Sequence, residues 1–356
     1  MLLLAGLMSM MAVGATAFFG MSDDDGASEE TDREASDQAA EDANAVTETE
    51  TEDGTSIMDF AVASDIDIDS ETDSSSTTTA ESDGRDEEIT VGTDEADTLT
   101  GSDKDDLTNG YAGDDEVSGG AGADQLFGGE GNDTLIGGDG DDTLHGGDDT
   151  DLMKGGAGTD HMFGHSGDDS LEGDAGDDSL VGSDGDDTLN GGEGDDALHG
   201  DIGNDSLTGG SGQDTLFGGW GDDTLSGVDP ESGENDTDGR DYLNGGGGDD
   251  VIIAGADDIV TTGDGDDSVV LGPWLSHAHQ AEIMDFEPDE DTLMILFDDA
   301  ADPDPDVGLE TDEDDASRQH VTLNGVRIAV VNNAEGLNLS HLSLVGESAF
   351  NLGQSA

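Results

Sequence analysis

The chain has 356 residues, of which 92 are Asp or Glu and only 7 are Lys or Arg, so its formal net charge is −85. This charge repels nucleic acids and anionic membrane surfaces, and we expect no nucleic-acid partner. The sequence has no cysteine, which excludes disulfides, zinc–thiolate sites and thiol catalysis. With 57 glycines and 4% aromatic residues, apolar burial alone cannot hold such a chain together. A hard cation that prefers oxygen ligands, calcium first, is the expected counter-charge.

The first 21 residues contain no charged side chain and would form a helix of about 30 Å, enough to cross a bilayer. A retained membrane span, a cleaved signal segment ending near Ala15-Thr16-Ala17 and a buried start are the three interpretations. The first two place the rest of the chain in the extracellular space or at the cell surface. Residues 22–90 are acidic and rich in Ser, Thr and Ala, which predicts a disordered linker.

A nine-residue repeat follows the linker. Glycine recurs every nine residues from Gly92 to Gly218, and an aspartate stands five residues after each glycine. Two residues after each aspartate comes an apolar side chain, with Thr108 as the exception. The recurring aspartates are Asp97, Asp106, Asp115, Asp124, Asp133, Asp142, Asp151, Asp160, Asp169, Asp178, Asp187, Asp196, Asp205, Asp214 and Asp223.

The spacing predicts short strands that must stack to bury their apolar residues. If two nonads form one coil, aspartates 18 residues apart, such as Asp124 and Asp142, lie about 4.8 Å apart. A column of carboxylates at that distance repels itself unless cations lie between its members. The predicted fold class is therefore all-β: a parallel β-roll over residues 91–270, with a disordered acidic linker before it and a small antiparallel β cap after it.

Units such as GGEGNDTLI (128–136) and GGWGDDTLS (218–226) match G-G-x-G-x-D-x-U-x, and the chain resembles the RTX, or haemolysin-type, calcium-binding repeat family. The resemblance implies several calcium ions between successive coils, held by the repeat aspartates and by carbonyl oxygens of the glycine stretches. It implies calcium-dependent folding of an exported protein. After a Pro-containing insertion at residues 227–240 the pattern resumes, and it adds Asp250 and Asp267 to the predicted ligands.

Residues 271–356 have less glycine and contain β-type runs, including a hairpin signal at Asn324-Gly325. We expect these runs to form the cap that covers the last coil. In RTX proteins the C-terminal tail carries the signal for a type I secretion apparatus, which makes that apparatus an implied partner.

The sequence contains no H-E-x-x-H, G-x-S-x-G or phosphate-binding loop, so we expect no enzymatic activity. His277 and His279 form an H-x-H pair, which is more often solvated than metal-binding. Calcium binding with calcium-dependent folding is the leading hypothesis. A calcium-stabilised adhesin or matrix component, in contact with a cell surface or polysaccharide, and the export module of a secreted enzyme are the alternatives.

Overall fold

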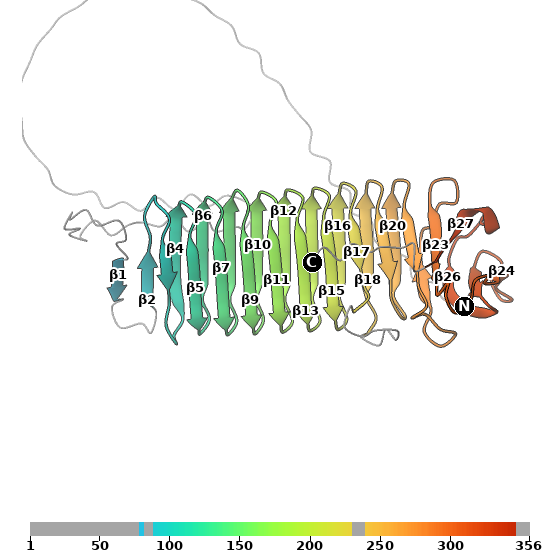
Figure 1. Ribbon diagram of the computed structural model, residues 1–356, viewed down its shortest axis with the longest axis horizontal. Helices are drawn as coiled ribbons and strands as arrows, with labels where there is room; N and C mark the ends of the chain where they lie inside the picture. The colour runs from blue at the N-terminus through green and yellow to red at the C-terminus, as the bar shows by residue number, and fades with distance from the viewer. Residues whose placement is uncertain (1–77, 82–87, 230–238, 347–356) are drawn as a thin grey trace, which may run out of the picture. The chain divides into compact units, whose positions relative to one another are not determined.

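The computed structural model describes residues 78–81, 88–229 and 239–346. They form a parallel β-solenoid in which successive strands alternate between two sheets and stack in chain order (Figure 1). This confirms the predicted all-β fold class. No helix in these ranges is long and apolar enough to cross a membrane. The predicted span or signal at residues 1–21 and nearly all of the predicted linker lie outside the described residues.

The described strands make two sheets. In spatial order, the first sheet contains β1 (Thr78–Glu81), β2 (Glu88–Val91), β4 (Asp106–Ala112), β6 (Gln125–Glu130), β8 (Thr143–Asp148), β10 (His161–Ser166), β12 (Ser179–Asp184), β14 (Ala197–Ile202), β16 (Thr215–Trp220), β18 (Tyr242–Gly247), β20 (Ile259–Asp264), β22 (Ala281–Ile283), β26 (Val326–Val331), β25 (Gln319–Leu323) and β24 (Val307–Thr311). The second contains β3 (Thr98–Thr100), β5 (Glu116–Ala121), β7 (Thr134–Asp139), β9 (Leu152–Ala157), β11 (Ser170–Ala175), β13 (Thr188–Glu193), β15 (Ser206–Ser211), β17 (Thr224–Ser226), β19 (Val251–Ala254), β21 (Ser268–Leu271), β23 (Thr292–Phe297) and β27 (Leu342–Gly346), which follows the 3₁₀ helix Leu339–His341.

The register confirms that two nonads make one coil. Leu144 pairs with Leu126 on one side and with Met162 on the other, an offset of 18 residues each time. Across the predicted insertion the offset between paired residues grows to 27, as between Leu216 and Leu243. The nine-residue spacing of the sequence therefore determines which strands stack on one another.

The strands extend beyond the three x-U-x residues that end each unit. β7 covers the last three positions of one unit and the first three of the next, so only the fourth to sixth positions remain as the turn. Gly138 lies inside this strand at φ +123°, and a Cβ there would overlap the carbonyl oxygen of Gly120 in the preceding coil. The second glycine therefore serves a close backbone approach within the strand, not the turn itself.

The core is a double column of apolar side chains between the two sheets, one from each repeat. Full burial of each is worth roughly 1.5–3 kcal/mol. Thr108, the exception in sequence, occupies the same column at 0% exposure. The column from the first to the last regular unit contains Leu99, Val117, Leu126, Leu135, Leu144, Met153, Met162, Leu171, Leu180, Leu189, Leu198, Leu207, Leu216 and Leu225.

The solenoid begins earlier than predicted. β2 starts at Glu88, inside the segment expected to be disordered, and pairs in parallel with β4 through Ile89 and Leu107. Thr90 is at the phase of the buried repeat position, 18 residues before Thr108, and at 2% exposure it extends the buried column by one strand. The predicted end of the linker at residue 90 is therefore wrong, because residues 88–90 already belong to β2.

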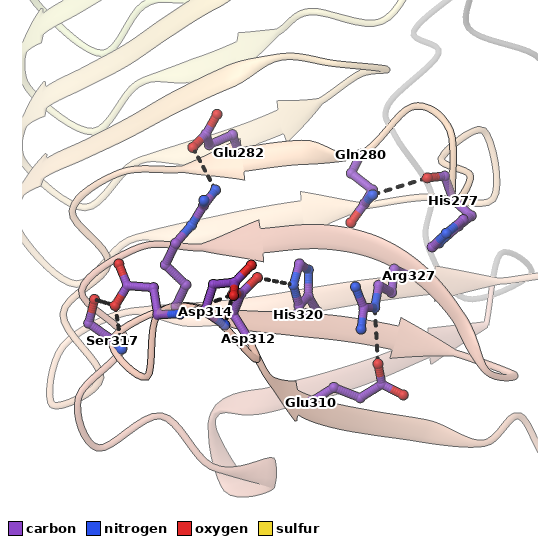
Figure 2. Close-up of polar contacts among 11 residues, drawn as sticks. His277, Gln280, Glu282, Glu310, Asp312, Asp314, Ser317, His320 and Arg327 are labelled. Atoms are coloured by element: carbon purple, nitrogen blue, oxygen red, sulfur yellow. Dashed lines mark hydrogen bonds and ion pairs between the residues drawn. The ribbon is translucent and has the colours of Figure 1, made fainter.

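The C-terminal cap is antiparallel only in part. β24, β25 and β26 form an antiparallel meander, and the predicted hairpin has Asn324 at φ +53° and Gly325 at φ +76°. β22, β23 and β27 instead continue the parallel sheets of the solenoid. Figure 2 shows two polar contacts that join the antiparallel strands and their connecting loop: His320 Nε2 to Asp312 Oδ2 at 3.0 Å, and Arg327 Nε to Glu310 Oε2 at 3.0 Å.

Candidate metal centre

The repeat aspartates form buried columns at the edges of the two sheets, each one at the end of a turn and directly before a strand, except Asp106, which is the first residue of β4. Of the predicted ligands, all from Asp106 to Asp267 are at most 4% exposed, whereas Asp97 is half-buried. In all units but that of Asp106, the residue two positions later is an apolar side chain of the core.

One carboxylate oxygen of each buried aspartate is used by the backbone. The N–H of Asp124 donates to Oδ1 of Asp142 at 2.8 Å, and the N–H of Asp142 donates to Oδ1 of Asp160 at 2.8 Å. The same bond crosses the insertion, from Asp214 N–H to Asp241 Oδ1 at 2.8 Å. These bonds link successive coils and hold every carboxylate in one orientation.

The second oxygen of most of these carboxylates has no hydrogen-bond partner. A buried carboxylate oxygen without a donor carries a large desolvation penalty, and a run of them points to a ligand. Within the described residues, the Oδ2 atoms that are buried and lack a hydrogen-bond partner belong to Asp115, Asp124, Asp133, Asp142, Asp151, Asp160, Asp169, Asp178, Asp187, Asp196, Asp205, Asp223, Asp250 and Asp267.

In several units a backbone carbonyl oxygen of the next coil borders the same space as Oδ2. A Cβ placed on Gly137 would meet Asp142 Oδ2 and, at 2.7 Å, the carbonyl oxygen of Gly155 in the next coil. Gly128 stands in the same relation to Asp133 and Gly146. The first glycine of the unit thus leaves open a narrow space onto which two oxygen atoms from different coils face. Oxygen donors of this kind fit a hard cation such as calcium.

Burial makes the column resist ionisation. It raises the pKa of Asp142 to about 7; the hydrogen bond from Asp124 opposes the shift, and the charges of Asp124 and Asp160 add to it. The same burial raises the pKa to about 7 at Asp151, Asp187, Asp196 and Asp250, and to about 6 at Asp133, Asp169, Asp178, Asp205, Asp223 and Asp267.

The first two predicted ligands differ from the rest. Oδ2 of Asp97 accepts from the backbone N–H of Thr93 at 2.7 Å and from its hydroxyl at 2.9 Å. Oδ2 of Asp106 accepts from the N–H of Ser102 at 2.6 Å and from its hydroxyl at 3.1 Å. Thr93 and Ser102 replace the second glycine of their units, so protein donors complete these two carboxylates and close the column at this end.

Three aspartates that the sequence analysis did not include extend the columns. Asp241 accepts from Asp214, Asp258 accepts from Asp241 at 3.0 Å, and Asp291 accepts from Asp267 at 3.2 Å. Each stands two residues before a buried apolar side chain, as in Asp291-Thr292-Leu293, which was the available signal. Oδ2 of Asp258 and of Asp291 accepts a backbone N–H, from Gly255 at 2.5 Å and from Glu287 at 2.7 Å, so protein donors occur at this end too.

Side chains alone do not build a metal site here. In the ranges that the structure covers, no three His, Asp or Glu side chains gather closely enough to hold an ion, so backbone carbonyls must supply part of any coordination shell. The H-x-H pair does not converge: His279 Nδ1 lies 2.7 Å from Asp257 Oδ2, and the carbonyl of His277 accepts from Gln280 (Figure 2).

Comparison with known proteins places the same residues in a family. The family model described as the RTX calcium-binding nonapeptide repeat (4 copies) matches residues 91–126, 127–162, 163–198, 199–227 and 235–269. These ranges contain every unpartnered Oδ2 named above. Among curated proteins, no sequence matches the chain significantly.

Proposed function

Because the chain belongs to the RTX calcium-binding nonapeptide-repeat family, we propose that its columns of buried aspartates bind calcium and that this binding is coupled to folding. The observation that carries the proposal is the run of buried Oδ2 atoms that lack a hydrogen-bond partner in the described residues. Three features agree with it. The available ligand atoms are oxygens, the arrangement repeats from coil to coil, and the buried side chains all carry charges of the same sign.

The ligands would be Asp Oδ2 atoms together with carbonyl oxygens of the first glycines, as at Asp142 and Gly155. Oδ1 stays in its hydrogen bond to the preceding coil and keeps each carboxylate in place. Calcium supplies positive charge that offsets both the desolvation of the carboxylates and their mutual repulsion. The apolar column holds successive coils at the separation that brings these oxygens together.

Coupling to folding follows from how the ligands are assembled. Oxygens from different coils converge only when those coils are stacked, so the unfolded chain has no comparable site. Each occupied site then adds to stability by mass action. Extracellular calcium modules bind at about 10⁻⁴–10⁻³ M, a range that would leave such a chain unfolded at cytosolic calcium levels. We therefore propose that the protein folds after export and works in the extracellular space or at the cell surface.

The test is far-ultraviolet circular dichroism of the full chain at neutral pH, in chelator and then with rising calcium, with magnesium as the matched control. We expect a cooperative gain of β signal with calcium and little with magnesium, which demands near-octahedral geometry and keeps its water. A β signal that is the same in chelator and in calcium would refute the coupling.

The export route is tested separately. Retention or cleavage of residues 1–21 is read from the mature N-terminus by mass spectrometry of the native protein. Dependence on a type I secretion apparatus is read from the amount of protein outside cells with and without the transporter. Protein that stays in the cytoplasm of its own cells would contradict the proposed location, while calcium binding could still hold.

A second candidate, a calcium-stabilised adhesin or matrix component, is favoured by one surface feature. Trp220 and Ile202 are 74% and 57% exposed and lie beside Asp184 and Asp201 along an open groove of about 440 Å³ on β12, β14 and β16. Large exposed apolar side chains next to acceptor groups suit contact with an external surface such as a polysaccharide. Loss of calcium-dependent binding to cells or polysaccharide in Trp220→Ala would support this role, and unchanged binding would count against it.

A further inference from the structure

A pair of histidines lies on the outward face of the first sheet, away from the aspartate columns. His145 is the ninth residue of its unit, on β8, and His165 is the second residue of its unit, on the adjacent strand β10. His145 Nδ1 and His165 Nε2 are 3.0 Å apart. Two imidazole nitrogens from neighbouring strands thus face each other directly.

Packing holds the two rings in place. The His145 ring is stacked between Phe127, with centroids 4.8 Å apart, and Phe163, at 4.9 Å. The His165 ring lies against His145 with its centroid at 5.3 Å. Side chains held by stacking lose little freedom when they bind a ligand, so the pair is preorganised.

His165 occupies a backbone position that favours glycine. Its φ is +81°, whereas Gly147 in the same position of the preceding coil has φ +130°. A non-glycine residue in this region carries a strain of order 1 kcal/mol. The replacement of His165 by glycine should therefore leave the coil intact, which makes it a useful variant.

We propose that His145 and His165 together bind a borderline transition-metal ion, with copper(II) preferred, at a site separate from the calcium column. Imidazole nitrogen suits copper, nickel and zinc, whereas calcium prefers oxygen. With metal–nitrogen bonds of about 2.0–2.1 Å, nitrogens 3.0 Å apart subtend an angle of roughly 90–95° at the metal. That angle is compatible with cis positions at a square-planar or tetragonal ion, and copper(II) has the highest affinity among the divalent first-row metals for nitrogen ligands.

The protonation of the rings is compatible with this role. In the contact seen here one of the two facing nitrogens carries a hydrogen and the other accepts it. For both to bind a metal, that hydrogen moves to the far nitrogen of its own ring, which changes the tautomer and leaves the charge of the ring unchanged. No third His, Asp or Glu side chain gathers with the pair among the described residues, so water completes the coordination.

The test uses untagged, calcium-saturated full chain with one equivalent of copper(II), observed by electron paramagnetic resonance. Saturation with calcium keeps the aspartate columns filled, and the spectrum separates nitrogen from oxygen ligands. We expect the signature of two coordinated imidazoles. Copper coordinated by oxygen alone would overturn the proposal.

Three variants sharpen the result. His165→Gly restores the usual residue of the repeat, and His145→Phe continues the stack of Phe127 and Phe163. Each should weaken copper binding by at least about tenfold, the lower bound known for loss of even an outer-sphere partner. His199→Phe is the matched control, because His199 holds the same ninth position on β14, stacks on Phe217 and has Gly219 where His145 has His165. Equal copper affinity in wild type, His165→Gly and His145→Phe would also overturn the proposal.

Discussion

The backbone N–H of Asp124 and Oδ1 of Asp142 are joined by a 2.8 Å hydrogen bond between adjacent coils. The two oxygens of the Asp142 carboxylate therefore have different roles. Oδ1 contributes to the stacking of the backbone, and Oδ2, which has no hydrogen-bond partner in the described part of the chain, faces the space beside Gly137. Under the proposed function, the residue that orders the coil also supplies an oxygen to calcium.

Asp142→Asn should remove calcium without removing the coil. The amide oxygen can still accept from Asp124, but the charge and one anionic oxygen are lost, so bound calcium should fall by about one ion per chain. The measurement is equilibrium dialysis followed by elemental analysis.

Asp141→Asn is the control for that experiment. It removes the same charge one residue away, at an exposed side chain whose Oδ1 accepts from the N–H of Thr159 at 3.0 Å. Its calcium content should equal that of the wild type. If both variants lose calcium equally, the effect comes from net charge and not from a ligand.

Gly137→Ala should block one site by filling it. The new Cβ would meet Asp142 Oδ2 and the carbonyl oxygen of Gly155, at a cost in stability of roughly 1–3 kcal/mol and with loss of bound calcium. Gly325→Ala is the comparison: Gly325 has φ +76° and nothing within 4 Å of a Cβ, so only backbone strain is added. Calcium content that is unchanged in Gly137→Ala would contradict the location of the site.

The stability of the calcium-free chain should rise as the pH falls. Burial raises the pKa of Asp142 and Asp196 from 3.8 to about 7, so between these values the folded state binds more protons than the unfolded state. Stability from these groups is therefore fully present below pH 3.8 and is lost as the pH rises through about 7. Circular dichroism in chelator should show β structure that increases on acidification from pH 8.

Proton release provides an independent check on the same groups. At pH 6 calcium should displace protons from the columns, and in a pH-stat the release should vanish well above pH 7. An acid-induced gain of β structure without proton release on calcium addition would show that another effect, such as the lowering of overall charge, is responsible.

The regular part of the structure could be predicted because the same nine-residue spacing positions both the buried apolar side chains and the aspartates of the candidate site. The spacing that puts Leu126 over Leu144 also puts Asp124 over Asp142, so the coil register followed from the sequence. The completion of Asp97 by Thr93 was not predictable, because it depends on where a backbone N–H and a hydroxyl point. Asp291 was not predicted because it lies 24 residues after Asp267, outside the nine-residue spacing. The contact of His145 with His165 joins residues at two different repeat positions, which no single period links.

The apolar column should contribute to the stability of the calcium-loaded coil at each buried position. Leu180→Ala removes a side chain that is 0% exposed and should cost about 2–5 kcal/mol. Leu152→Ala makes the same change at a side chain that is 42% exposed and should lie within about 0.5 kcal/mol of the wild type. Urea unfolding at saturating calcium measures both, and equal losses would contradict the assignment of the core.

The most direct test is a crystal structure of the calcium-saturated protein with an anomalous difference map. The account predicts peaks between successive coils, within bonding distance of Oδ2 of the repeat aspartates from Asp115 to Asp267, and none at Oδ2 of Asp97, Asp106 or Asp258, where Thr93, Ser102 and Gly255 already donate. Peaks confined to exposed carboxylates such as Asp141, with the gaps beside Asp142 and its equivalents lacking calcium, would contradict it.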